Sequence, residues 1–359
     1  MTVASETGGR VVGRAGLRAR WIYGPRADLL IALCWVPLWA VGHVLSAGRG
    51  PADDDLLRRA LAATFVISFL HQPLTLGLVY GDPQQFNQRR RLFIWAPVVT
   101  VALVTVAVVA QLWVVIPIAA LWNTVHTLQQ RYGLSRIYAR KSGYGSALLD
   151  RSVLYAWMVC VVLAVAADPG TTGLVRRVGL DQVNAGGIRL LTDVRPLALV
   201  LLAPAGLVAL AATAALVRQE ARAPAANPAK WGYQASSLVL IASIAVDPAA
   251  GFIAYVGAHA VEYFVVVYRT TASRYDGRSD TAGLLPWAAR KAPGRITAIA
   301  LVVALALAVH ARLHGDAYDA ALYTVGVLHF LYDGFIWKLR RPAVASDFAI
   351  PPVAVGGGP

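Results

Sequence analysis

Stretches of about 20 apolar residues recur along the whole chain, and they constrain its fold more than any other feature. A helix of that length spans the hydrocarbon core of a bilayer, which is roughly 30 Å thick. With 57% hydrophobic and only 14% charged residues, the composition is far from that of an average soluble globular protein. We therefore predict an all-α fold, a polytopic transmembrane helix bundle.

The apolar runs predict about ten spans. The seventh and ninth runs look short, and the third and fourth are joined without a clear polar break, so nine or eleven spans are alternatives. The ten predicted spans cover residues 27–47, 60–80, 92–110, 113–138, 148–167, 196–217, 234–246, 251–268, 296–309 and 320–337.

The distribution of basic residues predicts the orientation of these spans. Cytoplasmic loops of membrane proteins carry an excess of Lys and Arg. If both termini are cytoplasmic, most of the 33 basic residues fall on the inner side. The exceptions, which would lie outside, are Arg49, Arg58, Arg59, Arg176, Arg177, Arg189, Arg195 and Arg312. We therefore predict a multi-pass protein of the cytoplasmic (inner) membrane, with both ends inside.

The same distribution explains the formal net charge of +14. Basic residues at the cytoplasmic face satisfy topology and attract anionic headgroups, and no Lys/Arg stripe alternates with aromatic residues as nucleic-acid binding would require. We expect the lipid bilayer as a partner and no nucleic acid.

The domain organisation expected from the sequence is simple. Residues 1–26 form a cytoplasmic N-terminal segment, and residues 27–341 form a single transmembrane helical domain. An Ala/Pro/Arg-rich linker, residues 218–231, separates six spans from four. The tail, residues 342–359, ends in Gly-Gly-Gly-Pro and is expected to be disordered.

Four histidines lie inside predicted spans at one apparent depth: His71, His126, His259 and His329. Their spans run in the same direction under the charge assignment, so depth can be compared by counting residues to the inner end. At 1.5 Å rise per residue the four lie within about 3 Å of one another, roughly 15 Å from that end. Ionisable side chains inside a bilayer are costly and usually functional, so we predict that the four share one site.

Each histidine has a polar residue about one helical turn further along, and residues three or four apart share a helix face. Each helix can therefore present an imidazole together with an oxygen ligand or an acceptor that orients the ring. These polar residues are Thr75, Gln129 and Gln130, Glu262, and Asp333, and Asn123 lies one turn before His126.

Four imidazoles with one or two carboxylates favour a metal site. Mixed sets of histidine and carboxylate ligands with open positions are typical of non-haem iron that activates oxygen. We predict His71, His126, His259, His329, Glu262 and Asp333 as metal ligands. Glu262 would be a ligand or bridging carboxylate, and Asp333 a ligand or the acceptor that fixes an imidazole tautomer. We predict both carboxylates as catalytic residues. Thr75, Asn123, Gln129 and Gln130 would support the ligands or contact the substrate.

Several alternatives remain at this point. Each histidine alone could be an interhelical hydrogen-bonding group. Paired histidines also bind b-type haem, and His/carboxylate chains form the proton relays of transporters. A zinc-dependent intramembrane hydrolase is a further alternative. The cofactor is therefore expected to be a metal ion, with mono- or dinuclear iron preferred and copper, zinc or haem b as alternatives.

Two segments carry a family resemblance. The strings from Trp122 to Gly133 (WNTVHTLQQRYG) and from His329 to Lys338 (HFLYDGFIWK) resemble signatures of uncharacterised polytopic bacterial membrane proteins. At class level the chain is similar to histidine-liganded membrane oxygenases and desaturases, although the His-x-x-x-His and His-x-x-His-His boxes of desaturases are absent. This similarity implies a metal-dependent oxidoreductase that oxidises a lipid-soluble substrate with dioxygen. Its partners would be a hydrophobic small-molecule or lipid substrate and an electron donor.

Overall fold

The computed structural model describes residues 19–48, 50–223, 226–278 and 282–351, and all regular structure in these ranges is helical. Seven helices among the described residues are long and apolar enough to cross a membrane, which indicates a multi-pass membrane protein. Two of the seven are interrupted: α1 (Pro25–Leu33) continues into α2 (Trp35–Ala47), and α3 (Pro51–His71) into α4 (Pro73–Tyr80). The others are α6 (Arg90–Val109), α8 (Ala147–Ala167), α11 (Ala185–Ala221), α13 (Pro248–Tyr275) and α15 (Ala292–Arg312).

Three further long helices are more polar: α7 (Val115–Ser142), α12 (Pro228–Val246) and α16 (Gly315–Ile336). Each of the ten predicted spans overlaps one of these long helices, but the count of ten spans itself stays a prediction. α7 and α16 carry His126, His329 and Asp333. Polar side chains lower the mean hydropathy of a helix, which explains why α7 and α16 are not among the seven.

Short helices connect the long ones. They are α5 (Pro83–Asn87), α9 (Pro169–Arg177), α10 (Leu180–Val183), α14 (Leu284–Ala289) and α17 (Pro342–Asp347). Many helices in the chain begin with proline, whose missing N–H would be unpaired at that position anyway. The Asp247 side chain, for example, accepts from the Ala250 amide at 3.1 Å and caps α13 beside Pro248.

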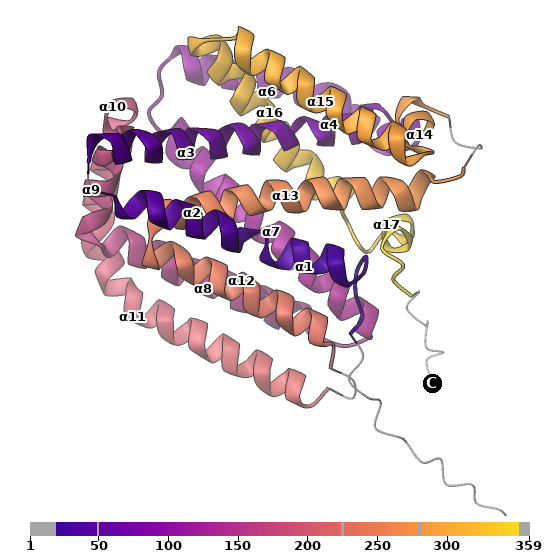
Figure 1. The fold of residues 1–359 in the computed structure, drawn as a ribbon, viewed down its shortest axis with the longest axis horizontal. Helices are drawn as coiled ribbons and strands as arrows, with labels where there is room; N and C mark the ends of the chain where they lie inside the picture. The colour runs from indigo at the N-terminus through magenta and orange to yellow at the C-terminus, as the bar shows by residue number, and fades with distance from the viewer. Residues whose placement is uncertain (1–18, 49, 224–225, 279–281, 352–359) are drawn as a thin grey trace, which may run out of the picture.

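Helix α13 lies at the centre of the bundle, and Figure 1 shows it crossing the middle of the molecule. It packs against α2, α3 and α12, while α11 packs on α8 at one edge of the bundle. Small residues let the backbones of α2 and α13 approach closely: a Cβ added to Gly42 would lie 2.8 Å from the Ala250 Cα. Such contacts drive helix association in lipid, where no hydrophobic force acts between helices.

The outer helices turn large apolar side chains away from the bundle. Leu103 on α6, Val200 and Leu207 on α11, and Leu301 and Leu305 on α15 are all strongly exposed. Monomeric soluble proteins rarely expose large contiguous apolar surfaces to water. A surrounding lipid phase accounts for this exposure.

A proline, Pro73, separates α3 from α4 next to His71. Pro73 has no N–H to donate to the Phe69 carbonyl, so the helix breaks. The Gln72 amide bonds the Phe69 carbonyl instead, at 3.2 Å. His71 is therefore the last residue of α3, and Thr75 lies in the first turn of α4.

The C-terminal segment differs from the sequence prediction. Residues 342–347 form α17 rather than a disordered tail, and Val344, Phe348 and Ile350 are buried in one cluster with Ile22 and other side chains. Local composition misses this packing because it depends on contact with residues remote in sequence. Residues 352–359 lie outside the described part of the chain.

We also predict defined boundaries for the linker and the N-terminal segment. The linker expected over 218–231 is shorter, because α11 extends to Ala221 and α12 begins at Pro228. Within the N-terminal segment 1–26, residues 1–18 lie outside the described part. The Ile22 amide donates to Asp28 at 2.6 Å and ties the remainder to α1.

Candidate metal centre

Four helices bring the four histidines together in the interior of the bundle. His71 comes from α3, His126 from α7, His259 from α13 and His329 from α16. All four are at most 6% exposed. Residues spread over more than 250 positions of sequence therefore meet at one place, as the hydrogen bond between His71 and His329 shows.

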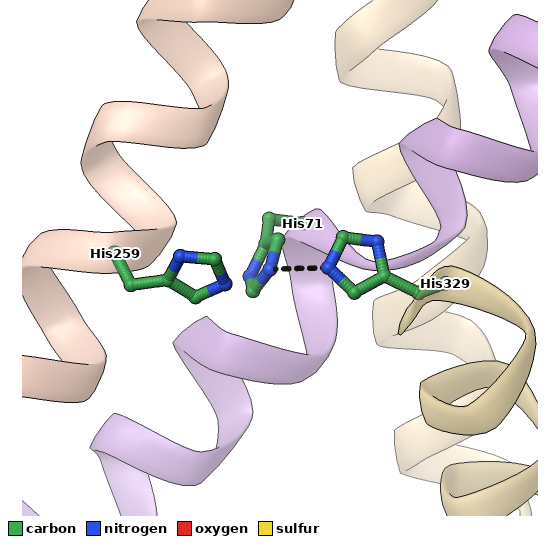
Figure 2. Close-up of side chains that lie close together, drawn as sticks. All are labelled: His71, His259 and His329. Atoms are coloured by element: carbon green, nitrogen blue, oxygen red, sulfur yellow. Dashed lines mark hydrogen bonds between the residues drawn. The ribbon is translucent and has the colours of Figure 1, made fainter. Parts of the chain in front are cut away.

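The rings of His71, His259 and His329 converge, with His71 between the other two (Figure 2). The Nε2 atoms of His71 and His329 are 3.3 Å apart. Each of the three residues offers one ligand atom, and these atoms all lie within 4.8 Å of one another. An ion held at about 2.0–2.1 Å sets neighbouring ligand nitrogens about 3 to 3.5 Å apart. This buried triad could hold a metal ion.

A second group shares one ring with the first. His126, His329 and Asp333 also place their ligand atoms within 4.8 Å of one another. The Asp333 Oδ2 atom is 3.8 Å from His126 Nε2 and 3.9 Å from His329 Nε2. Four imidazoles and one carboxylate thus form two adjoining groups that share His329.

Several imidazole nitrogens in these two groups have no hydrogen-bond partner. Among the described side chains these are Nδ1 of His71, Nε2 of His126 and both nitrogens of His259. Buried polar atoms without partners are costly and rare in native proteins. A cation bound among them would satisfy the unpaired lone pairs.

Thr75 orients the ring of His329. Its Oγ1 lies 2.6 Å from His329 Nδ1 and donates to Asp333 Oδ1 at 3.0 Å. A hydroxyl has one proton to give, so the consistent assignment is that His329 Nδ1–H donates to Thr75. That tautomer leaves Nε2 of His329 with a free lone pair pointing at the other imidazoles.

Tyr263 completes the support of Asp333. Its hydroxyl lies 2.5 Å from the Thr75 hydroxyl and donates to Asp333 Oδ1 at 2.9 Å. Two hydroxyls therefore engage Oδ1 of Asp333 and leave Oδ2 to face His126 and His329. Such contacts set the orientation and basicity of metal ligands.

Glu262, which we predict as a metal ligand, contacts side chains outside the histidine set. It forms a fully buried ion pair with Arg131, and its Oε2 accepts from the Gln130 side chain at 3.0 Å. Arg131 NH1 also donates to Ser237 at 3.0 Å. Both carboxylate oxygens of Glu262 are thus engaged, and Glu262 is in neither of the two possible metal-ligand groups. The Arg131 guanidinium and the Gln130 amide therefore account for the position of this carboxylate.

The remaining predicted residues, Gln130, Gln129 and Asn123, all lie on the helix that carries His126. Gln130 also donates to the carbonyl of His259 at 3.3 Å, so it links α7 to α13 beside the triad. Gln129 lies on the wall of a cavity that reaches His126. The Asn123 Oδ1 atom is buried and has no hydrogen-bond partner.

Two residues at the site, Arg131 and Tyr263, are not among the residues predicted from the sequence. Arg131 is 0% exposed and lies beside Glu262, and its place directly after Gln130 on the His126 helix was the available signal. Tyr263 lies four residues after His259, which puts it on the histidine face of α13.

Comparisons with protein-family models, with curated proteins and with solved structures give no match to this chain. The function is therefore argued from the geometry of the candidate metal centre.

Proposed function

We propose that this protein is an integral membrane metalloenzyme whose metal is held by His71, His126, His259, His329 and Asp333. The observation that carries the proposal is the meeting of four buried imidazoles inside an apolar bundle, three of which have nitrogens without a hydrogen-bond partner. A hydrogen-bonding role would leave those lone pairs unused. Imidazole binds zinc, copper and iron well.

We infer iron and an oxidation reaction. Histidines together with one carboxylate and an open coordination position are the usual environment of non-haem iron that activates dioxygen. Bound iron would supply the one-electron chemistry that dioxygen needs. Insertion of one oxygen atom into a substrate C–H bond, with reduction of the other to water, also requires two electrons from a separate donor. The protein's own part is to orient the ligands through Thr75 and Tyr263 and to exclude bulk water.

The substrate would be lipid-soluble. The centre lies among helices whose outer faces are apolar, and a substrate dissolved in the bilayer can reach such a bundle directly. Ten spans with both termini in the cytoplasm, in the inner membrane, belong to the same proposal. The excess of basic residues on one predicted side supports this orientation.

A zinc-dependent hydrolase is the second candidate, because His71, His259 and His329 alone form an all-histidine triad. Three histidines with a fourth position open for water are a known catalytic zinc arrangement. Haem is less well supported: the His71 ring lies between His259 and His329 (Figure 2), so a flat macrocycle between those two rings would collide with it. The rings of His71 and His259 are only 4.7 Å apart.

The proposal is tested by elemental analysis of the purified protein, with an absorption spectrum recorded on the same sample. We expect about one or two iron atoms per chain and no Soret band. His126→Ala and His259→Ala should each lower the metal content strongly, because each removes a ligand. His314→Ala, an exposed histidine at the start of α16, is the matched control and should keep full metal content.

Other outcomes would contradict the proposal in distinct ways. Stoichiometric zinc would favour the hydrolase, and a Soret band would favour haem. If no metal co-purified or bound on reconstitution, the metalloenzyme proposal would fall and a proton-coupled transporter would gain support.

A further inference from the structure

A cavity of about 750 Å³ opens beside the candidate metal centre. His126, Tyr263 and Asp333 line its inner end. The volume lies within the range of about 300–1,000 Å³ typical of small-molecule sites. The cavity therefore offers a bound molecule direct access to the centre.

The walls of this cavity are largely apolar. Leu134, Ile137 and Val266 line it, together with Trp337 and Phe348. Side chains of this kind suit a hydrocarbon chain, because burying it removes apolar surface from water. Lipid-like substrates therefore match the middle of the cavity better than polar ones.

Two glycines leave space on the same walls. Gly133 on α7 and Gly334 on α16 line the cavity, and a Cβ added to either would meet no atom within 4 Å. Neither glycine has a positive φ angle. The backbone conformation therefore permits a larger residue at these two positions.

The far end of the cavity is basic. Its lining includes Arg136, Arg140, Arg151, Lys338 and Arg340. Asp150 neutralises Arg136 at 2.5 Å, and Arg140 donates to the Leu339 carbonyl at 2.8 Å.

The three other cations at this end have no carboxylate partner among the described residues. Arg151 lies over the Tyr155 ring and Lys338 over the Phe335 ring. Partial burial and the neighbouring charges of Arg340, Arg89 and Arg341 lower the pKa of Lys338. This end of the cavity thus holds an excess of positive charge that an anion would relieve.

We propose that the cavity binds an anionic amphiphile, a lipid with a carboxylate or phosphate headgroup. The headgroup would contact Arg151, Lys338 and Arg340, and the hydrocarbon chain would extend along the apolar walls toward His126 and Asp333. This assignment rests on the proposed function in one respect: it makes the amphiphile the substrate of the metal centre. The preference of Lys and Arg for cytoplasmic loops would allow basic residues anywhere on the predicted cytoplasmic face. Arg151, Lys338 and Arg340 instead all line one cavity.

The test is equilibrium binding to the full-length protein in phosphatidylcholine nanodiscs. The probes are oleate, 1-oleoylglycerol 3-phosphate and, as the neutral counterpart, 1-oleoylglycerol. We expect at least one of the anions to bind about tenfold more tightly than the neutral lipid, since charge-assisted contacts are the strong ones. The tighter anion identifies the headgroup as carboxylate or phosphate. Equal affinity for all three probes would overturn the proposal.

A charge variant with a matched control separates the cavity from the membrane surface. Arg151→Gln/Arg340→Gln should weaken binding of the preferred anion about tenfold and leave 1-oleoylglycerol unchanged. A tenfold change corresponds to about 1.4 kcal/mol for the two lost contacts together. Arg90→Gln/Arg91→Gln removes two exposed charges of α6 that do not line the cavity. Anion binding should survive in this control. Equal weakening in both double variants would mean surface attraction only and would overturn the proposal.

A steric variant tests the apolar part. Gly133→Leu fills the cavity without a backbone clash and should abolish binding of the anion. Gly232→Leu, on the exposed face of α12 where an added Cβ also meets no atom, should bind normally. Retained binding in Gly133→Leu would show that the amphiphile sits elsewhere.

Metal content measured on the same preparations distinguishes the two proposals. A metal-loaded protein that does not prefer the anions overturns the substrate class alone. A metal-free protein that binds an anion selectively overturns the proposed function alone, and the cavity assignment stands.

Discussion

At the scale of single residues, the orientations of the His329 ring and the Asp333 carboxylate depend on Thr75. Its hydroxyl joins His329 Nδ1 to Asp333 Oδ1 and contacts the hydroxyl of Tyr263. One side chain therefore sets both the tautomer of the His329 imidazole and the direction of the Asp333 carboxylate. The sequence placed Thr75 near the site through its spacing from His71, but the spacing could not reveal that its partners come from α13 and α16.

We expect Thr75→Val to weaken metal binding. Valine keeps the shape of threonine and removes the hydroxyl, and loss of such an outer contact lowers metal affinity about 10- to 100-fold. Competition with a chelator of known affinity measures the change. Thr75→Ser, which keeps the hydroxyl, should bind metal like the original protein. Unchanged affinity in Thr75→Val would refute the orienting role.

The ion pair of Arg131 with Glu262 makes a second prediction at this scale. Both residues are 0% exposed, and breaking a buried pair by removing one partner typically costs about 3–5 kcal/mol. Arg131→Met should therefore lower the thermal unfolding midpoint markedly. Arg131→Met/Glu262→Met should recover much of the loss, because no unpaired charge remains buried.

An exposed pair supplies the control for that measurement. Arg59 and Asp55 lie four residues apart on α3 and are largely solvent- or headgroup-exposed. Arg59→Met should change the free energy of unfolding by less than about 1 kcal/mol. If Arg59→Met and Arg131→Met were equally destabilised, burial of the Arg131 pair would not matter for stability.

At the scale of helices, close packing of α2 on α13 holds the centre of the bundle. Gly42 of α2 faces Ala250 of α13, and α13 in turn presents His259, Glu262 and Tyr263 to the site. Hydropathy predicted both helices as spans. Hydropathy could not predict which faces of the two helices contact each other. An apolar face that contacts lipid and an apolar face that contacts another helix have similar hydropathy.

Gly42→Ala and Gly232→Ala form a matched pair for testing this contact. Both replace a helical glycine, so both gain similar helix propensity, about 1 kcal/mol at most. Gly42→Ala also forces a Cβ to 2.8 Å from the Ala250 Cα, and overpacking costs about 1–3 kcal/mol. We expect a lower unfolding midpoint for Gly42→Ala and an equal or higher one for Gly232→Ala. An equal rise in both would argue against close contact of α2 with α13.

At the scale of the whole molecule, the orientation in the membrane is still a prediction from charge. The four histidines lie at one predicted depth only if the spans that carry them run in the same direction through the membrane. The structure brings these histidines together, as spans of the same direction require. The sides of the two termini need a separate measurement.

Reporter fusions measure those sides. A green fluorescent protein fused after residue 359 should fluoresce, because that reporter folds in the cytoplasm and we predict a cytoplasmic C-terminus. Alkaline phosphatase at the same position should be inactive, and active when fused after residue 179, in a segment predicted to lie outside. An active phosphatase at the C-terminus would contradict the predicted orientation.

The sequence by itself determined the all-helical class and the approximate positions of the long helices. It also pointed to the histidines and Asp333 of the candidate metal centre, because apolar runs, charge and helical spacing are local properties. Only the tertiary structure decided which side chains each of these residues contacts. It separated Asp333, which faces His126 and His329, from Glu262, which pairs with Arg131. Both carboxylates follow a histidine by one turn, so spacing treats them alike. The difference arises from side chains on other helices, and a periodic pattern along one helix carries no information about its neighbours.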